Sequence, residues 1–537
     1  MAIPSISSKY FFFGLFICCT TLTGSAQKTD SLFYDFEYAP RLSGWDESDN
    51  LSRIFLKPLE RAGNATLFYS GGTGDFHDAN SSEQVAGYGL FSEAYQRFSP
   101  KTMFYGSAGY AGQIEKNRSG SAFLNPDEMP FDIVDMDAAN KGTKKLEIYG
   151  LSGAISHRLT SRLALGAKLD YQAKNYTRTK DLRHSNKILD LKGSIGVSYQ
   201  LLPRLIAGVH YRYERYIEGI SFDAYGNTDR QYTSLIDFGA SFGKSELFSQ
   251  NGYTAKDKNN PFVNQVHEGG IEIEVPVSTR LNLFNETSFG TGDGYFGKRS
   301  SSSIVHTEHD VRRFRNRLLA TYRTPKQIHR LEVTAHNQKT TNYENAYRSE
   351  TSPSGNTIYE YYGQNETGTK TVSAAAVRYT LGWGESGTLP EWEVSLGTSF
   401  QHRSVRAVLY PYYREQTVNA HKEEFSVTHH HRIGSFTLSA FAGMGFRKGS
   451  GEMASDGVFT TPSSDAGAPK SQHEYLQRNY DYLTTATLLP EAGFRVLRPF
   501  RGIRYYLSAS YRGEKPIGAA TMSGSYHNTN LTIGAYF

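Results

Sequence analysis

The chain has 537 residues, with 58 basic and 53 acidic side chains and a formal net charge of +5. This small, dispersed charge argues against a nucleic-acid partner, and two cysteines are too few for a disulfide scaffold. Hydrophobic residues make up only 38% of the chain, whereas tyrosine (37) and phenylalanine (32) are abundant. A polar chain rich in glycine and aromatic residues is typical of membrane strands that are apolar on one face only.

Residues 1–26 have the pattern of a secretory signal peptide. Lys9 gives a basic start, an apolar stretch follows, and small residues end at Ala26. We therefore expect cleavage after Ala26 and export of the mature chain; acylation at Cys18 or Cys19, as in a lipoprotein, stays open as an alternative. Beyond this stretch no apolar run approaches the ~20 residues of a membrane helix. The exported chain is therefore either soluble or embedded as a closed barrel.

Residues 27–61 precede the first clear strand and form the second predicted region. They contain several aromatic residues, including Trp45, and an acidic cluster from Asp46 to Asp49. If the chain is a barrel, this segment either inserts into the barrel lumen as a small hatch or stays outside as a periplasmic tail. The sequence does not decide between these two interpretations.

From residue 62 to residue 537, apolar and polar side chains alternate with a period of two. Between Arg162 and Ala173 every odd position is apolar, and only one even position is. A strand places these two sets on opposite faces. A soluble sandwich also alternates, but here the polar face carries glycine, serine and charges of both signs, as a wet lumen does. We therefore predict an all-β fold, a transmembrane antiparallel β-barrel over residues 62–537.

Short turns that end in a basic residue precede many of the strands, as at Pro100-Lys101 and Pro203-Arg204. We interpret these as short periplasmic turns, since proline and glycine supply turn geometry. Longer polar stretches lie between them and are predicted to be extracellular loops: residues 115–145, 244–260, 342–356 and 448–472.

The alternation predicts about 18 strands, with 14 or 16 also possible. An even number places both ends of the barrel on the periplasmic side. The apolar run at residues 235–242 is either one more strand or a loop hairpin. The predicted strands cover residues 62–76, 82–98, 102–115, 145–158, 162–177, 187–201, 204–218, 264–277, 281–293, 302–323, 328–345, 357–384, 391–412, 420–432, 436–447, 476–496, 501–513 and 519–537.

The last strand carries a further signal, because Leu531, Ile533 and Phe537 share one face and the chain ends on an aromatic residue. This resembles the terminal strand of Gram-negative outer-membrane β-barrel proteins, although Ala535 stands where that family has a second outward aromatic residue. The resemblance implies an outer-membrane location, contact with outer-membrane lipid, and recognition of this strand by the barrel insertion machinery. The chain is most similar to uncharacterised barrels, and residues 27–61 are far too short for the plug domain of a TonB-dependent receptor.

Charged residues on the polar face are the candidate functional residues, because they would line the lumen. A row of arginines on one strand would attract anions and steer them through a pore. The alternative, which we favour, is that these arginines pair with carboxylates across the lumen and brace the wall. The predicted lumen-lining charges are Arg313, Arg315, Arg317, Glu272, Glu274, Glu332, Glu391, Glu393, Lys168 and Asp170.

Catalytic and metal-binding motifs are weak. There is no G-x-S-x-G nucleophile motif and no H-E-x-x-H zinc motif. Of three consecutive histidines, only His429 and His431 would share a strand face. We predict no enzyme activity, no cofactor and no metal.

Three functions remain open, and the first is favoured. The barrel is a channel or diffusion transporter for polar nutrients; or it is a non-conducting scaffold that partners a surface lipoprotein or uptake complex; or, third, it is a barrel enzyme. The sequence gives neither the substrate nor the oligomeric state.

Overall fold

The computed structural model describes residues 35–537 apart from residues 138, 227–228, 250, 257, 354, 356, 385–388 and 519–520. The predicted signal peptide, residues 1–26, lies outside the described residues, as do residues 27–34. Within the described part no helix is both long and apolar enough to cross a membrane.

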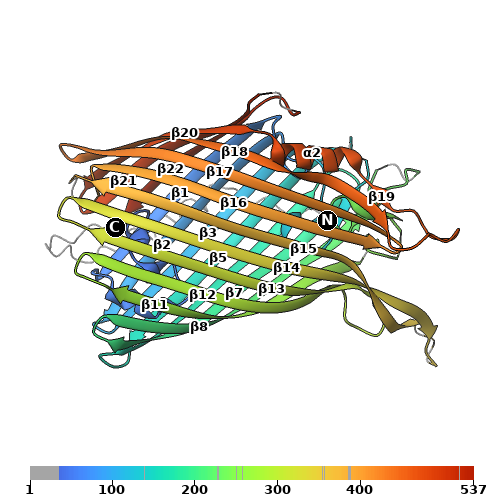
Figure 1. Ribbon diagram of the computed structural model, residues 1–537, viewed down its shortest axis with the longest axis horizontal. Helices are drawn as coiled ribbons and strands as arrows, with labels where there is room; N and C mark the ends of the chain where they lie inside the picture. The colour runs from blue at the N-terminus through green and yellow to red at the C-terminus, as the bar shows by residue number, and fades with distance from the viewer. Residues whose placement is uncertain are drawn as a thin grey trace, which may run out of the picture.

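Eighteen antiparallel strands form one closed barrel, as predicted (Figure 1). Each wall strand pairs with the next one along the chain, and β1 pairs with β22 from Asn64↔Tyr536 to Gly74↔Tyr526, which closes the ring. The wall strands are β1 (Arg61–Gly74), β2 (Gln84–Ser99), β3 (Thr102–Arg118), β5 (Gly142–Arg158), β6 (Leu163–Arg178), β7 (Arg183–Leu202), β8 (Leu205–Asp223), β11 (Asn259–Pro276), β12 (Leu281–Gly297), β13 (Val305–Arg323), β14 (Gln327–Thr351), β15 (Thr357–Trp383), β16 (Trp392–Leu409), β17 (Tyr412–Ile433), β18 (Phe436–Val458), β20 (Thr487–Phe500), β21 (Ile503–Pro516) and β22 (Tyr526–Tyr536).

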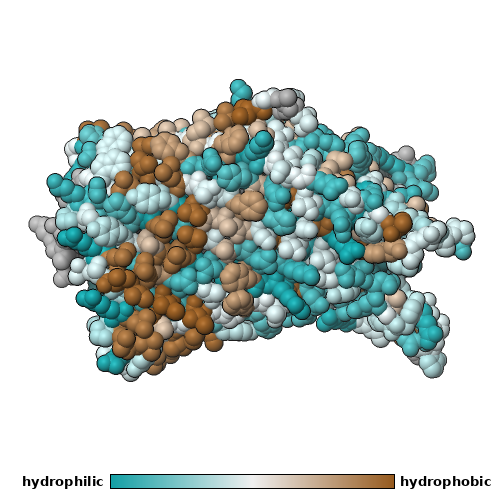
Figure 2. All heavy atoms as spheres, viewed as in Figure 1, coloured by the Kyte–Doolittle hydropathy of each residue, from teal (hydrophilic) through white to brown (hydrophobic). Residues whose placement is uncertain are grey.

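The outer surface carries a belt of apolar side chains near the end with the short turns (Figure 2). Outward residues such as Leu169, Ile195 and Ile271 are more than half exposed, whereas the inward Ser198 and Glu272 are fully buried. A barrel in lipid shows this inversion because its apolar residues face the hydrocarbon and its polar residues face the lumen. The period of two in the sequence therefore corresponds to lipid on one side and a polar interior on the other.

A second, four-stranded sheet is formed by the long loops between wall strands, and we call it the cap. It consists of β4 (Asp132–Asp135), β9 (Thr233–Asp237), β10 (Phe242–Leu247) and β19 (Lys470–Ser471). The apolar run at residues 235–242 is thus part of a loop hairpin rather than of a wall strand. Phe131, Ile133 and Phe238 of the cap pack with Phe262 and Phe296 of the wall, so the cap shares a hydrophobic core with the barrel.

One predicted strand, residues 476–496, is wrong in its first half. Residues His473–Thr484 form helix α2, and β20 begins only at Thr487. The helix buries Tyr475 and Leu476, which are adjacent in sequence. Adjacent side chains on a helix project only about 100° apart, so both can be buried on one side of α2, whereas a strand would place them on opposite faces.

The hairpin of β14 and β15 extends beyond the rest of the wall and projects at the lower right in Figure 1. Pairing of β15 with β16 begins only at Gly368↔Ala407, so Thr357–Thr367 pair with β14 alone. A carbon atom added at Gly368 would lie 2.6 Å from the backbone oxygen of Phe238 in the cap. The base of this hairpin therefore touches the cap directly.

Candidate functional site

The described residues 35–60, which we call the N-terminal segment, contact the inward face of the barrel wall. They fold into three 3-10 turns: η1 (Ala39–Leu42), η2 (Gly44–Asp46) and η3 (Leu51–Leu56). Their contacts reach widely separated parts of the ring, from β5, β6 and β7 beside η3 to Arg495 on β20 beside Asp35.

Apolar side chains anchor the N-terminal segment at two points. Trp45 packs edge-on against Phe284, with ring centroids 5.3 Å apart, and its Nε1 donates to Glu274 Oε2 at 2.7 Å. Ile54 and Phe55 are buried with Met103 in a second cluster. Burial of this kind is the main stabilising contribution for a segment with no strand pairing of its own.

Asn50 joins the two anchors and is fully buried. Its side-chain oxygen accepts from Ser52 N and caps η3, as asparagine commonly does at the start of a helix. Its Nδ2 lies 3.1 Å from the backbone oxygens of both Val197 and Val209, and 2.6 Å from Glu272 Oε2. One side chain thus links the segment to two wall strands and to a lumen carboxylate.

The predicted arginine row on β13 meets the acidic cluster of the N-terminal segment. Arg315 Nη2 lies 2.7 Å from Asp49 Oδ2 and also pairs with Glu268. Arg317 pairs with Glu47 of the segment and, at 2.8 Å, with Glu332 of β14.

Arg313, the third member of this row, lies 3.0 Å from Glu214 Oε2. The arginines therefore pair with carboxylates and brace the interior, as favoured above. Of the carboxylates that we predicted as their partners, only Glu332 pairs with one of the three arginines.

Most of the other predicted lumen charges face inward but contact residues other than the arginines of β13. Glu272 accepts from His210, Glu274 accepts from Trp45, and Glu393 lies 3.9 Å from Arg41 of the segment. Lys168 and Asp170 pair with each other at 2.9 Å on β6.

Glu391 lies in the turn before β16 rather than on the wall. Its backbone oxygen accepts from His430 N at 2.7 Å, and it makes no ion pair with any residue that the structure describes. This residue is therefore placed apart from the other predicted lumen charges.

Two contacts of the N-terminal segment were not predicted. Asp35 Oδ2 lies 2.6 Å from Arg495 Nη2 in a buried pair, and Phe36 stacks on Tyr536 with centroids 5.9 Å apart. The inward position of Arg495 follows from the alternation of β20, but the alternation does not identify its partner.

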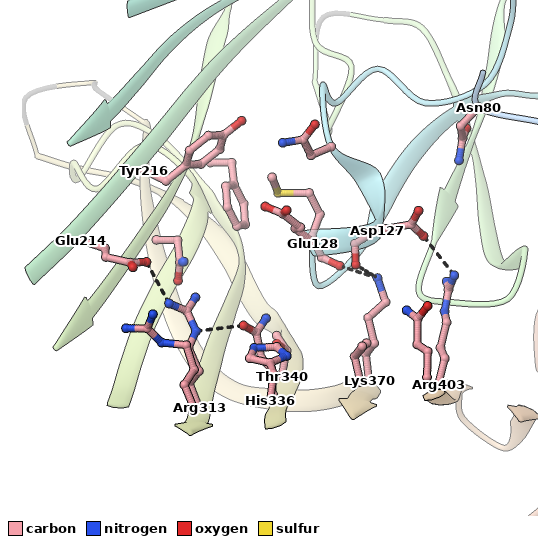
Figure 3. A pocket seen from close by; sticks show the side chains of 18 of the residues that line it. Asn80, Asp127, Glu128, Glu214, Tyr216, Arg313, His336, Thr340, Lys370 and Arg403 are labelled. Atoms are coloured by element: carbon pink, nitrogen blue, oxygen red, sulfur yellow. Dashed lines mark hydrogen bonds and ion pairs between the residues drawn. The ribbon is translucent and has the colours of Figure 1, made fainter. Parts of the chain in front are cut away.

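Two of the cavities that the described residues line are chambers within the barrel. The outer chamber, about 680 Å³, is bounded by cap-side loops and by wall residues such as Arg313 and Lys370 (Figure 3). The inner chamber, about 730 Å³, is lined by Asp35 and Tyr38 of the N-terminal segment and by wall residues such as Arg378. The lumen is thus hollow and polar but occupied at both ends.

One ion pair and two hydrogen bonds fix a cap-side loop to the wall beside the outer chamber (Figure 3). Arg403 lies 3.0 Å from Asp127 Oδ1, and its charge holds the pKa of that carboxyl below the ordinary range. Lys370 Nζ donates to the backbone oxygens of Asp127 and Met129 at 2.7 and 3.1 Å. These side chains keep residues 126–129 in place over the chamber.

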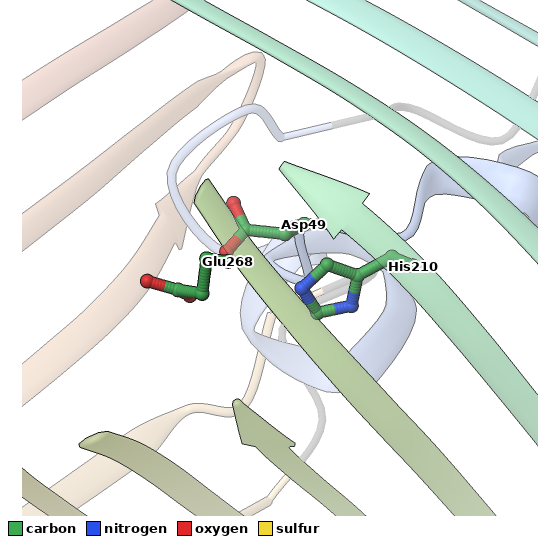
Figure 4. Close-up of side chains that lie close together, drawn as sticks. All are labelled: Asp49, His210 and Glu268. Atoms are coloured by element: carbon green, nitrogen blue, oxygen red, sulfur yellow. The ribbon is translucent and has the colours of Figure 1, made fainter. Parts of the chain in front are cut away.

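Asp49, His210 and Glu268 come together from the N-terminal segment, β8 and β11 (Figure 4). One ligand-type atom of each lies within 4.8 Å of the other two. His210 also lies against Glu272 and Glu286. We call these five residues the histidine–carboxylate cluster. No motif in the sequence indicated it, because its members are distant along the chain.

The predicted assembly residues lie on the outer face of β22. Leu531, Ile533 and Phe537 are 43, 55 and 52% exposed, and the inward Tyr536 is buried. Backbone hydrogen bonds of 2.7 and 3.0 Å join Phe537 to Gly63 beside the start of β1. Both ends of the barrel ring therefore meet at these residues.

Several solved outer-membrane proteins are similar to this chain at low identity. BauA, the ferric preacinetobactin receptor of Acinetobacter baumannii, has 8% identity and a TM-score of 0.38 over 89% of this chain and 80% of BauA. The transporter YddB of Escherichia coli has 7% identity and a TM-score of 0.40 over 88 and 81%. A mutant of TodX, described as a monoaromatic hydrocarbon channel, has 11% identity and a TM-score of 0.31 over 91 and 92%.

No curated protein matches the sequence. Residues 53–537, which include the last residues of the N-terminal segment and the whole barrel, match the family of unknown function DUF6850, and the chain belongs to that family.

Proposed function

We propose that this protein is an outer-membrane transport barrel for polar solutes and that the conformation described above is its closed state. The main support is the hollow, charged lumen, with chambers of about 680 and 730 Å³ inside an 18-stranded wall. Small barrels are filled by their own side chains, whereas barrels of ~16–18 strands enclose an aqueous path. A wall of this width lined with charges is suited to the passage of polar molecules.

Neither closure is part of the hydrogen-bonded ring of wall strands. The N-terminal segment is held by side-chain contacts such as Trp45–Glu274 and Asp49–Arg315, and the ring of strands closes through β1 and β22 without it. The cap pairs within its own sheet rather than with the wall strands. Either closure can therefore move without breaking the hydrogen-bonded ring.

The experiment that tests this proposal is conductance in a planar lipid bilayer. We compare the mature chain with a variant that lacks residues 27–60. We expect the mature chain to be silent or to open briefly, and the deletion variant to show steady conductance, because removal of the segment connects the inner chamber to the periplasmic side.

A second candidate is a non-conducting barrel that presents its cap to a surface lipoprotein or uptake complex. It is favoured by one observation: the cap has a hydrophobic core that includes Phe123, Phe131 and Phe238, so it is a folded surface rather than a set of loose loops. Silence of both bilayer samples, with correct folding shown by heat-shifted gel mobility, would contradict the transport proposal and favour this one.

The outer membrane lipid and the barrel insertion machinery are proposed as partners in either case. The apolar belt supports lipid contact (Figure 2), and the exposed Leu531, Ile533 and Phe537 support recognition of the last strand.

A further inference from the structure

We propose that His210, Asp49 and Glu268 bind a divalent transition-metal ion such as Zn²⁺ or Mn²⁺, which fastens the N-terminal segment to the wall. Imidazole and carboxylate are ligands that these ions use in proteins. Three protein ligands leave a further coordination position for water. The inference goes beyond the transport proposal, because metal binding is measured whether or not the barrel conducts.

The first observation is an unsatisfied imidazole nitrogen. The His210 side chain is fully buried, and its Nε2 makes no hydrogen bond within the described chain. Glu268 Oε2 is buried as well and has no hydrogen bond there, although Arg313 Nη1 lies 3.9 Å from it. A buried polar atom that lacks a hydrogen bond is costly, so the unsatisfied Nε2 of His210 indicates a ligand at this place.

The second observation is the partner of His210 Nδ1. This nitrogen lies within hydrogen-bond distance of the Glu272 carboxylate, and Glu272 also accepts from Asn50. In the neutral imidazole, donation from Nδ1 leaves the lone pair on Nε2, where a metal ion can bind. This carboxylate–histidine arrangement is the usual support of a metal-binding histidine.

The third observation is charge. The ion pairs around the cluster bring five carboxylates together with three guanidinium groups, all within the part of the chain that is described. The carboxylates outnumber the guanidinium groups in a buried place. Buried carboxylates are normally paired or bound to metal ions, so the cluster has the composition of a cation site. The carboxylates belong to Asp49, Glu214, Glu268, Glu272 and Glu286, and the guanidinium groups to Arg212, Arg313 and Arg315.

The geometry requires little adjustment. Ligands of one ion at about 2.0–2.2 Å are at most about 4.4 Å apart, and the three ligand-type atoms here lie within 4.8 Å of one another. Gly270 on β11 gives the imidazole its room, since a carbon atom added there would lie 2.1 Å from His210 Cε1. Arg212 and Arg315 remain as outer partners of the carboxylates.

The test is metal content of the purified mature chain. The protein is stripped with a chelator, dialysed against Zn²⁺, Mn²⁺ or Ca²⁺, and analysed by mass spectrometry for bound metal per chain. We expect one equivalent of Zn²⁺ or Mn²⁺, and a loss of affinity of at least about 10-fold in His210→Asn and in Asp49→Asn. The matched control is His430→Asn, a buried inward histidine that bonds Ser439 outside the cluster and whose replacement leaves binding unchanged.

A second readout separates metal binding from a folding defect. Asp49 lies on the N-terminal segment, so Asp49→Asn leaves every wall strand intact and its heat-shifted mobility should match that of the unaltered chain. Bound metal should slow proteolysis of the segment in the unaltered chain and not in this variant. The proposal is overturned if the unaltered chain retains no stoichiometric Zn²⁺ or Mn²⁺, if binding survives His210→Asn, or if only Ca²⁺ binds.

Discussion

Trp45 joins the N-terminal segment to the wall through its apolar ring and through its indole N–H group. The ring is 3% exposed and packs with Ile206, Phe284 and Leu319, and the indole nitrogen donates to Glu274. A buried tryptophan usually combines apolar contact with one satisfied hydrogen bond in this way.

We expect Trp45→Ala to weaken docking of the segment by about 3–5 kcal/mol, the usual cost of removing a large buried aromatic ring. Hydrogen exchange of the backbone amides in η3 measures this, and exchange should become faster in the variant. Leu56→Ala is the matched control, because Leu56 is 53% exposed in the same segment. Equal exchange in the two variants would contradict an anchoring role for Trp45.

Asp132 makes the cap sensitive to pH. Burial raises the pKa of this carboxyl to about 7. A hydrogen bond from Ser121 lowers the pKa, and the negative charge of the nearby Asp237 raises it. The folded cap therefore favours the protonated acid. Its contribution to cap stability is fully present below about pH 4, where the unfolded acid is also protonated, and is lost as the pH rises to about 7.

We expect the amides of β4 and β9 to exchange faster at about pH 8 than at about pH 5, after correction for intrinsic rates. The full rise in the pKa of Asp132 corresponds to a change of roughly 4 kcal/mol in the free energy of opening the cap. Asp132→Asn should reduce this pH dependence. Part of the dependence should remain, because burial also raises the pKa of Asp237. An unchanged pH dependence in the variant would show that Asp132 is not its source.

The sequence predicts the inward direction of residues better than their partners. The period of two fixes which face Arg313, Arg315 and Arg317 occupy, because every wall strand has one lipid face and one lumen face. It carries no information on Asp49, which lies in a segment with no strand period and reaches the arginines only after the chain has folded. The histidine–carboxylate cluster was missed for the same reason.

At the scale of elements, β22 has two roles. It pairs with β21 and with β1 and so closes the ring, and its outward residues contribute to the apolar belt. The glycine at position 63 faces the Phe537 ring, since a carbon atom added there would lie 2.2 Å from it. The terminal aromatic residue is therefore seated against the first strand.

We expect Phe537→Ala to lower the fraction of folded, heat-shifted barrel in cells several-fold, while the purified barrel loses only about 1 kcal/mol, because Phe537 is half exposed. Phe98→Ala is the control, since Phe98 is 78% exposed at the same rim, at the end of β2. If both variants assemble equally well, the last strand is not read through its final residue.

Strand prediction failed where the chain leaves the wall. Residues 476–484 were predicted to begin a strand, yet they belong to α2, which packs against the cap and against β17 and β18. Alternation identifies strands that separate lipid from lumen. A loop element that buries one side against a cap has no such constraint.

At the scale of the whole molecule, the ring of 18 strands is complete without the N-terminal segment. The wall strands are joined by backbone hydrogen bonds, whereas the segment contacts the wall mainly through side chains, with one backbone hydrogen bond from Arg97 N to Glu60 O. The strand count was predictable, because every turn and loop interrupts the alternation. The segment and the cap that close the lumen were not predictable, because their sequences show no regular alternation of apolar and polar residues.

We expect deletion of residues 27–60 to leave the strand content, measured by circular dichroism, and the heat-shifted mobility of the barrel unchanged. The wall arginines and carboxylates that lose their partners in the deletion are then hydrated by water in the lumen. This hydration limits the free-energy cost of leaving them unpaired. Loss of the heat shift would mean that the segment is required for folding, and the bilayer test would then need a variant such as Trp45→Ala.

The projecting hairpin of β14 and β15 behaves mechanically as a lever. Its free part, Thr357–Thr367 with the facing residues of β14, is roughly 35 Å long at ~3.3 Å per residue. Its fulcrum is Gly368, which abuts the cap at Phe238, and Lys370 two residues further on bonds to the loop that holds Asp127. We expect a sideways load on the tip to reach the cap through these two contacts, so that an object docking at the tip would disturb the entrance without entering it.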